Sequence, residues 1–269
     1  MRVVVMLAVY NQAHTLPECL ESLQAQTGTA WQLCALDDAS TDGSGSLLQQ
    51  WVERHGGIFF RNTKRLGLAA SLNRIWREVP AELYARMDGD DICLPERLRR
   101  QVEYLERHPE VAVLGGAAEI MDADGNTLGI LERPAEHEQL VRVRFRENPF
   151  VHPTVMMRRR FLEEMGGYDE GLPRGQDYDL WLRGINRFRY ANLSSPLLRY
   201  RCNSRPGWKA IYWGTVVLIR AARRERLGWQ AYGYAARYAI GAVLMRMGWR
   251  SHRWKAVPAG NSDRLAPAA

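Results

Sequence analysis

The chain has 269 residues, of which 46% are hydrophobic and 25% are charged, a balance that excludes an intrinsically disordered protein and a multi-spanning membrane protein. This length suits one large domain or two small ones. The four cysteines form no CxxC pair, so we predict neither a zinc ribbon nor a disulfide framework, and a reducing compartment fits best. The net charge of +7 is uneven, because residues 205–269 contain 12 Lys and Arg against two acids.

The N-terminal part of the chain alternates predicted strands and helices. Residues 3–10, VVVMLAVY, form a continuous apolar run that is typical of a strand buried on both faces. Polar residues follow without a small-residue cleavage site, so we do not interpret this run as a signal peptide. Further strands are predicted at 31–38, 57–62 and 82–88, and helices at 16–26, 40–56 and 67–79. This order predicts a parallel sheet with helices on both faces, in which ligands bind beyond the carboxyl ends of the strands.

The second half of the chain has a less regular order. A charged surface helix is predicted at 95–110, a strand with a hairpin at 111–129, and a strand, a helix, a Gly-rich turn and a second helix within 152–185. Beyond residue 205 the composition becomes rich in Arg and Trp, and we place a boundary there. No window of the chain reaches the ~20 apolar residues that a membrane-spanning helix requires.

Two acidic clusters follow predicted strands. In the sequence DGDD, Asp88 and Asp90 would face the same way in an extended segment, and the glycine between them leaves room for a ligand. Hard cations such as Mg²⁺ and Mn²⁺ prefer oxygen ligands of this kind, so the pair could hold a metal ion. The alternative is that DGDD forms an ordinary turn with solvated acids. Asp91 either assists this pair or caps the helix that follows. The acids at 37–38 either accept a hydrogen bond from a base or a ribose, or cap the next helix.

Six motifs occur in order along residues 3–201: VVVMLAVYN, LDDASTDGS, NTKRLGLAASLN, RMDGDDICLPERL, HPTVMMRRRFLEEMGGYDE and QDYDLWLR. Each is weak alone, but their order and spacing resemble the family 2 glycosyltransferases. The resemblance implies the GT-A fold, an α/β, Rossmann-like and mostly parallel sheet flanked by helices. Residues 1–204 would form this catalytic domain, and residues 205–269 a basic, Trp-rich helical extension.

The resemblance also assigns residues on the donor side. Asp38 is expected to bind the nucleotide base, with Val9 and Asn11 lining the same pocket. Arg65 either contacts the base or the phosphates, or is an ordinary solvated arginine.

Asp88 and Asp90 match the DxD pair of the family. Asp88 is expected to contact the ribose and the metal, and Asp90 to be the more direct metal ligand. The expected cofactor is a divalent cation, Mn²⁺ or Mg²⁺, which would neutralise the leaving nucleoside diphosphate.

The catalytic base of the family is the Asp of a Glu-Asp pair, which is Gln176-Asp177 in this sequence. Asp177 therefore matches the base that takes the proton of the acceptor hydroxyl. Gln176 replaces the Glu that is commoner in the family. This difference affects the residue expected to orient the acceptor, and it leaves the residue expected to remove the proton unchanged. Asp179 is the alternative carboxylate, although an acid in a first helical turn also suits the helix dipole. His152 and Arg174 are expected on the acceptor side, with a hydrogen-bonded structural role as the alternative for His152.

The resemblance implies an inverting, metal-dependent transfer of a sugar from a nucleotide-diphosphate donor to a saccharide or lipid-linked hydroxyl, in surface polysaccharide or glycolipid synthesis. One alternative is a sugar-nucleotide nucleotidyltransferase, but that class needs a Gly-rich loop near the first strand, and AVYNQAHTL contains no Gly. A second alternative is a membrane-associated binding module with a decayed site. The joint presence of Asp38, Asp88, Asp90 and Asp177 argues against such decay.

The basic C-terminal segment predicts a membrane contact. Arg-rich helices with Trp and aliphatic residues are typical of interfacial helices on anionic membranes. The alternative is a helical pair packed on the catalytic domain with its Arg residues solvated. No nucleic-acid-binding motif accompanies the charge, so we predict no nucleic-acid partner. We expect a cytoplasmic protein that is peripheral on the cytoplasmic face of the membrane.

Overall fold

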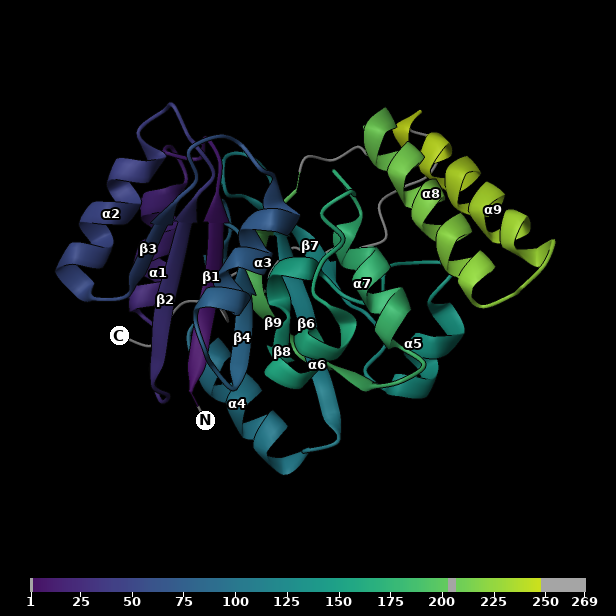
Figure 1. The fold of residues 1–269 in the computed structure, drawn as a ribbon, viewed down its shortest axis with the longest axis horizontal. Helices are drawn as coiled ribbons and strands as arrows, with labels where there is room; N and C mark the ends of the chain where they lie inside the picture. Colours follow the sequence, from purple (N-terminus) through teal and green to yellow (C-terminus); the bar gives the residue numbers. More distant parts are fainter. Residues whose placement is uncertain (1, 203–206, 248–269) are drawn as a thin grey trace.

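The computed structural model describes residues 2–202 and 207–247, which form a layered α/β fold (Figure 1). Its strands are β1 (Val3–Val9), β2 (Trp31–Asp37), β3 (Ile58–Arg61), β4 (Leu83–Met87), β5 (Ile92–Cys93), β6 (Val111–Met121), β7 (Thr127–Leu131), β8 (Met156–Arg158) and β9 (Arg189–Arg201). Its helices are α1 (Leu16–Gln24), α2 (Ser44–His55), α3 (Leu68–Glu78), α4 (Arg97–Arg107), α5 (His137–Val143), the 3₁₀ turn η1 (His152–Thr154), α6 (Arg159–Met165), α7 (Gln176–Gly184), α8 (Trp208–Arg224) and α9 (Gln230–Arg246).

The described strands form one sheet in the order β3-β2-β1-β4-β8-β6-β9-β5, with β7 paired to β6. β1 is parallel to β2 and β4, and β2 is parallel to β3. β8 runs antiparallel to both β4 and β6, whereas β6 and β9 are parallel. The predicted α/β fold is confirmed, and the sheet is parallel in its N-terminal part and mixed beyond β4.

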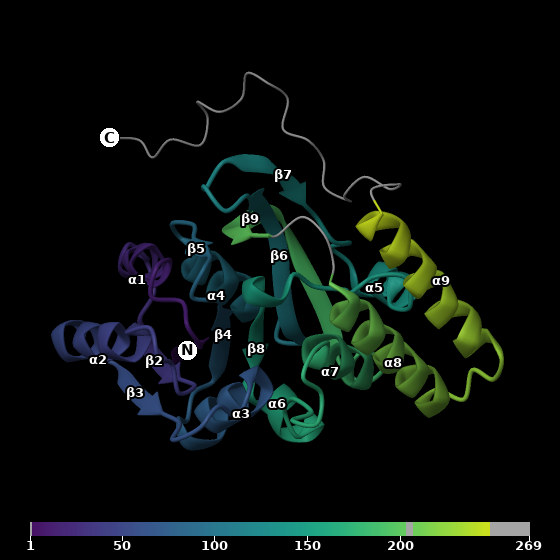
Figure 2. The ribbon, with the colours of Figure 1, turned by 90° about the horizontal axis from the view of Figure 1, so that it is seen from above.

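Strand β1 shows why helices cover both faces of this sheet. Val3 and Val5 pack with residues of α1 and α4, whereas Val4 and Met6 pack with residues of α3, α6 and α7. Figure 2 shows these two helical layers on opposite sides of the strands. Successive side chains of a strand point to opposite faces, so a strand between two such layers is apolar at every position. All seven residues of β1 are accordingly buried.

The C-terminal helices α8 and α9 form a pair beside α7 (Figure 1). Val217 and Leu218 of α8 are fully buried in a cluster that includes Tyr178 and Leu182 of α7. Residues 207–247 thus pack on the rest of the fold. The division into two domains at residue 205 stays a prediction, and residues 248–269 of the predicted extension lie outside the described residues. Among the helices that the structure describes, none is long and apolar enough to cross a membrane.

Candidate active site

The carboxyl ends of β1, β2 and β4 lie side by side because the strands are parallel. The last residue of β1, Val9, pairs with the last residue of β2, Asp37, so the residues that follow both strands meet at one edge of the sheet. A cavity of about 210 Å³ at this edge is lined by four of the residues predicted to bind the donor: Val9, Asp38, Arg65 and Asp88. Its other lining residues are Ala8, Tyr10, Gln12, Gly67, Leu68 and Ser71.

Asp38 organises the wall of this cavity. Its Oδ1 accepts hydrogen bonds from Asn62 Nδ2 and from the Leu66 N–H, both at 2.8 Å, and its Oδ2 accepts one from the Gly67 N–H at 2.8 Å. The carboxylate is buried, so these donors replace the water that it loses. Asp38 therefore fixes the loop that leads into α3 and carries Arg65.

The capping alternative for the acids at 37–38 is wrong. Helix α2 begins only at Ser44, whose N–H donates to Asp42 Oδ1 at 3.0 Å. Asp37 instead accepts the N–H of Ser40 at 2.9 Å and pairs with Arg61 at 3.1 Å. Asp37 thus holds the turn after β2, while Asp38 faces the cavity.

The two remaining predicted donor residues differ in their placement. Arg65 lies over the ring of Tyr10, with its guanidinium carbon 3.9 Å from the ring centroid, a cation–π contact. Asn11 is exposed and does not line the cavity; its Oδ1 accepts the Thr41 N–H at 2.9 Å. Sequence reasoning missed Tyr10 as the platform for Arg65, although the two residues lie in motifs that we recognised.

The three acids of DGDD converge as a possible cation site. Carboxylate oxygens of Asp88, Asp90 and Asp91 lie within 4.8 Å of one another. Burial and then the charge of Asp88 raise the pKa of both Asp90 and Asp91. Asp91 is almost fully buried, and its Oδ2 has no hydrogen-bond partner among the described residues. Oxygen ligands, mutual repulsion and an unpartnered buried oxygen fit a divalent cation.

Asp91 does not cap the helix that follows, so this alternative is wrong. Helix α4 begins at Arg97, after Glu96, and Glu96 makes no side-chain capping bond. Asp91 Oδ1 instead accepts the backbone N–H of Arg201 at 2.8 Å.

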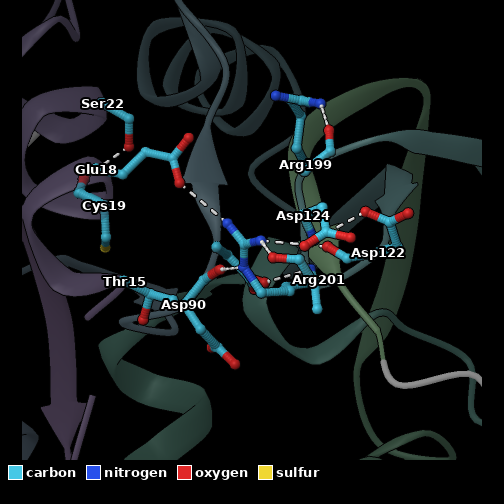
Figure 3. A network of polar contacts seen from close by, with 12 residues as sticks. Thr15, Glu18, Cys19, Ser22, Asp90, Asp122, Asp124, Arg199 and Arg201 are labelled. Carbon is cyan, nitrogen blue, oxygen red and sulfur yellow. Dashed lines mark hydrogen bonds and ion pairs between the residues drawn. The ribbon is translucent and has the colours of Figure 1, made fainter. Parts of the chain in front are cut away.

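Arg201, which sequence reasoning missed, ties the acidic loop to its surroundings (Figure 3). Its Nε donates to the Asp90 carbonyl at 3.0 Å and its Nη2 pairs with Glu18 of α1 at 3.0 Å. Its Nη1 donates to the carbonyls of Asp122 and Ala123, at 3.2 and 2.7 Å. Because one guanidinium offers five donors in a fixed plane, Arg201 locks the loop against both α1 and the β6–β7 hairpin.

A second missed residue, Arg86, lies beneath the acidic loop. Its side chain is fully buried and its Nη2 pairs with Asp88. Its Nε and Nη1 have no hydrogen-bond partner in the part of the chain that the structure describes. The motif RMDGDD contained the signal, because residues 86 and 88 share one face of β4 and its extension.

Asp177 lies at the start of α7, directly after Gly175 and Gln176. Burial raises the pKa of Asp177, and a hydrogen bond from Asn148 Nδ2 to its Oδ2, at 2.7 Å, opposes that rise. Gln176 is buried, and its Oε1 accepts no hydrogen bond from the residues that the structure describes. The other carboxylate, Asp179, already pairs with Arg183 at 2.7 Å.

The acceptor-side residues His152 and Arg174 also differ in their surroundings. His152 Nε2 lies 3.0 Å from the Tyr168 hydroxyl. Burial, with the nearby charge of Arg86, holds the pKa of His152 well below its usual range, so the ring is neutral near pH 7. Arg174 is exposed on the loop before α7, and within the described part of the chain no hydrogen bond or ion pair holds its side chain.

The charges of Asp177 and of Asp88, which lines the donor cavity, act on one common group, the Tyr168 hydroxyl. Burial raises the pKa of the Tyr168 hydroxyl, the charge of Arg86 opposes this, and the charges of both Asp177 and Asp88 raise it further. The charges of Asp88 and Asp177 therefore both reach the Tyr168 hydroxyl, although 89 positions separate the two acids in sequence.

The model for glycosyl transferase family 2 matches residues 4–166, more than half of the chain. The chain belongs to glycosyl transferase family 2. EpsE of Bacillus subtilis (strain 168) is 32% identical over 90% of this chain and 90% of its own length. The amylovoran biosynthesis glycosyltransferase AmsE of Erwinia amylovora is 34% identical over 77% of this chain and 80% of its own.

The fold of this glycosyltransferase is also similar to that of a solved enzyme. The mannosyltransferase PcManGT of Pyrobaculum calidifontis, solved in complex with GDP-Man and Mn²⁺, matches with a TM-score of 0.61 and 19% identity. The match covers 93% of this chain and 76% of that one. At this identity the likeness concerns the fold, and it confirms the predicted GT-A architecture.

We predict that Arg201→Gln weakens Mn²⁺ binding roughly 10- to 100-fold, the usual effect of removing a group that orients metal ligands. Arg199→Gln is the matched control, because Arg199 lies on the same strand but contacts Glu119 and the Gly125 carbonyl. Electron paramagnetic resonance of free Mn²⁺ measures both affinities. Equal affinities of the two variants would show that Arg201 does not hold the cation ligands in place.

Proposed function

We propose that this glycosyltransferase carries out an inverting, metal-dependent transfer of a sugar from a nucleotide-diphosphate donor to a hydroxyl group. The observation that carries the proposal is that Asp88 belongs both to the lining of the donor cavity and to the acidic triad, while its charge and that of Asp177 act on the same Tyr168 hydroxyl. GDP-Man and Mn²⁺ in the similarly folded PcManGT support a nucleotide sugar and a divalent cation.

In the proposed donor complex, the base lies against Asp38 and Val9, and Arg65 faces the phosphates from its platform on Tyr10. Asp88 contacts the ribose, and Asp88 and Asp90 hold Mn²⁺ or Mg²⁺. When bound, the cation would neutralise the charge that develops on the leaving diphosphate. Asn11 supports the turn beside the pocket and is not proposed to touch the base.

In the proposed transfer, the acceptor oxygen attacks the anomeric carbon from the side opposite the diphosphate. The bond from that carbon to the diphosphate oxygen breaks as the new carbon–oxygen bond forms, and Asp177 takes the proton of the acceptor hydroxyl. One displacement inverts the anomeric centre. Arg174 and Gln176 are proposed to contact the acceptor, whereas His152 supports Tyr168.

The proposed acceptor is a saccharide or lipid-linked hydroxyl in the synthesis of a surface polysaccharide. The role of AmsE in amylovoran biosynthesis supports this class of product. The geometry gives less support to a decayed binding module, because the acid triad and Asp177 are all present and partly or fully buried. The nucleotidyltransferase alternative has no support from the family match.

We predict that Asp177→Asn lowers kcat by about 10²- to 10⁴-fold, because the amide cannot accept the acceptor proton, while nucleotide binding is retained. Release of nucleoside diphosphate from a panel of nucleotide sugars with Mn²⁺ measures the reaction, and calorimetry measures nucleotide binding. Asp124→Asn, an exposed position in the β6–β7 hairpin, is the control. Wild-type turnover by Asp177→Asn would exclude Asp177 as the base.

We further propose that α8 and α9 rest on an anionic membrane at the cytoplasmic face, where lipid-linked acceptors are available. The pair and the turn between its helices expose the large side chains of Trp208, Tyr212, Trp229, Tyr232 and Ile240. Arg and Lys residues in the same helices would face lipid phosphates. Exposed aromatic side chains beside basic ones are typical of an interfacial helix.

We predict that the double substitution Trp229→Ser and Tyr232→Ser reduces binding to phosphatidylserine vesicles by more than about tenfold, because two aromatic side chains lose their burial in lipid. Flotation of the full chain measures the binding. Leu128→Ser, at an exposed site on β7, is the control. Unchanged flotation of the double variant would contradict a membrane contact through this surface.

A further inference from the structure

Asn148, a residue to which neither the family motifs nor the proposed function assigns a role, contacts the proposed base directly. Its Nδ2 donates to Asp177 Oδ2 at 2.7 Å. Its Oδ1 accepts the N–H of Phe150 at 3.2 Å. Since only the oxygen of an amide can accept a hydrogen bond, the second contact turns the nitrogen of Asn148 towards Asp177.

The backbone around Asn148 is held from two distant parts of the chain. Arg133, which follows β7, donates from Nε to the Asn148 carbonyl at 2.9 Å. Asn192 of β9 donates from Nδ2 to the Pro149 carbonyl at 3.1 Å. The proline that follows Asn148 also restricts the backbone of Asn148 to extended conformations. The amide is therefore supported as a rigid donor and does not depend on Asp177 for its place.

We propose that Asn148 is the positioning residue of the base: its amide fixes Asp177 Oδ2, so that Oδ1 is left to take the acceptor proton. The proposal rests on the proposed role of Asp177. A neutral donor suits this task, because an arginine or lysine in the same place would form an ion pair and weaken the carboxylate as a base. Asn148 holds the carboxylate in one orientation with a smaller loss of basicity.

On α7 itself, burial raises the pKa of Tyr178 and the charge of Asp177 adds to that rise, so this hydroxyl stays neutral where a carboxylate titrates. The remaining ionisable groups around Asp177 come from three other elements. Arg86 of β4 lowers the pKa of Asp177, and the charge of Asp177 raises the pKa of Tyr168, after α6, and of Tyr238 on α9. Arg86 is fully buried and both tyrosines are neutral below pH 9. None of the three therefore changes charge where a carboxylate titrates. The acids of the cation site are the same in wild type and in the Asn148 variants, so a difference between their acid limbs reports on Asp177.

The test compares Asn148→Ala with wild type in a pH profile of kcat. A hydrogen bond to the ionised form lowers the pKa of a carboxyl group, so its removal raises that pKa by roughly one to two units. The acid limb should move to higher pH by that amount, and kcat below it should fall about tenfold or more, with the donor KM unchanged. Asn186→Ala, at an exposed position between α7 and β9, should keep the wild-type profile.

Asn148→Asp is the second variant, because it keeps the size of the side chain and places a carboxylate against Asp177. Two acids that share a site push one pKa upwards, so this variant should shift the limb further than Asn148→Ala. A purely structural role predicts a lower melting temperature with an unshifted limb in both variants. That result in folded protein with wild-type nucleotide binding would overturn the proposal.

A readout without turnover separates this proposal from the proposed function. Infrared spectra across a pH titration show the carbonyl band of protonated Asp177, which is assigned by its loss in Asp177→Asn. We expect its midpoint to move upwards in Asn148→Ala and Asn148→Asp. An unshifted midpoint overturns the positioning role even if wild type transfers sugar, and a shifted midpoint supports it even if no tested donor reacts.

Discussion

The parallel pairing of β1 with β2 and β4 is the constraint on which the site depends. It places Val9, Asp38 and Asp88 at one edge of the sheet, where a cavity forms between them. A shift of one residue along β1 would exchange the side chains that face the two helical layers. The packing of Val3 and Val5 against one layer and of Val4 and Met6 against the other therefore also fixes the position of the donor site.

Electrostatic repulsion among the acids of DGDD is the second constraint, and it explains why Arg86 is buried beside Asp88. Two carboxylates at a separation of ~5 Å repel each other by about 3 kcal/mol at an effective dielectric constant of ~20. An exposed ion pair stabilises a protein by only about 0–1 kcal/mol, so an arginine on the surface would not offset the repulsion between the two carboxylates. Arg86 pairs with Asp88 from a fully buried position, and Arg201 fixes the loop backbone. A divalent cation completes the neutralisation in the proposed complex.

The fold and the donor side of the site were largely predictable from the sequence. The apolar run of β1, the helical periodicity after it and the acids at strand ends depend on local chemistry. Of the five donor residues that the family resemblance assigned, Val9, Asp38, Arg65 and Asp88 line one cavity and Asn11 does not. The motifs also located Asp177, whose role stays a prediction. The neighbouring sequence suggested that Asp91 could cap the next helix. That alternative was wrong, because its hydrogen-bond partner, the Arg201 N–H, lies 110 residues away in the chain.

The supporting residues were missed for the same reason. Asn148 and Arg201 are ordinary polar residues in sequence, and only the tertiary fold brings them to Asp177 and to the acidic loop. The C-terminal helices show a similar limit: their composition predicted a membrane surface, whereas the burial of Val217 and Leu218 reveals an inner face that packs on α7. The pair can serve both purposes, because it buries these residues and also exposes large aromatic side chains.

The stereochemistry of the reaction tests the central claim most directly, because a single base and a single displacement permit only one outcome. Proton NMR in the first minutes of the reaction, before mutarotation, shows the anomeric configuration of the sugar that is transferred to an acceptor or to water. An α-configured nucleotide sugar should give a β product. An α product would contradict a site in which Asp177 activates the acceptor for direct, in-line attack.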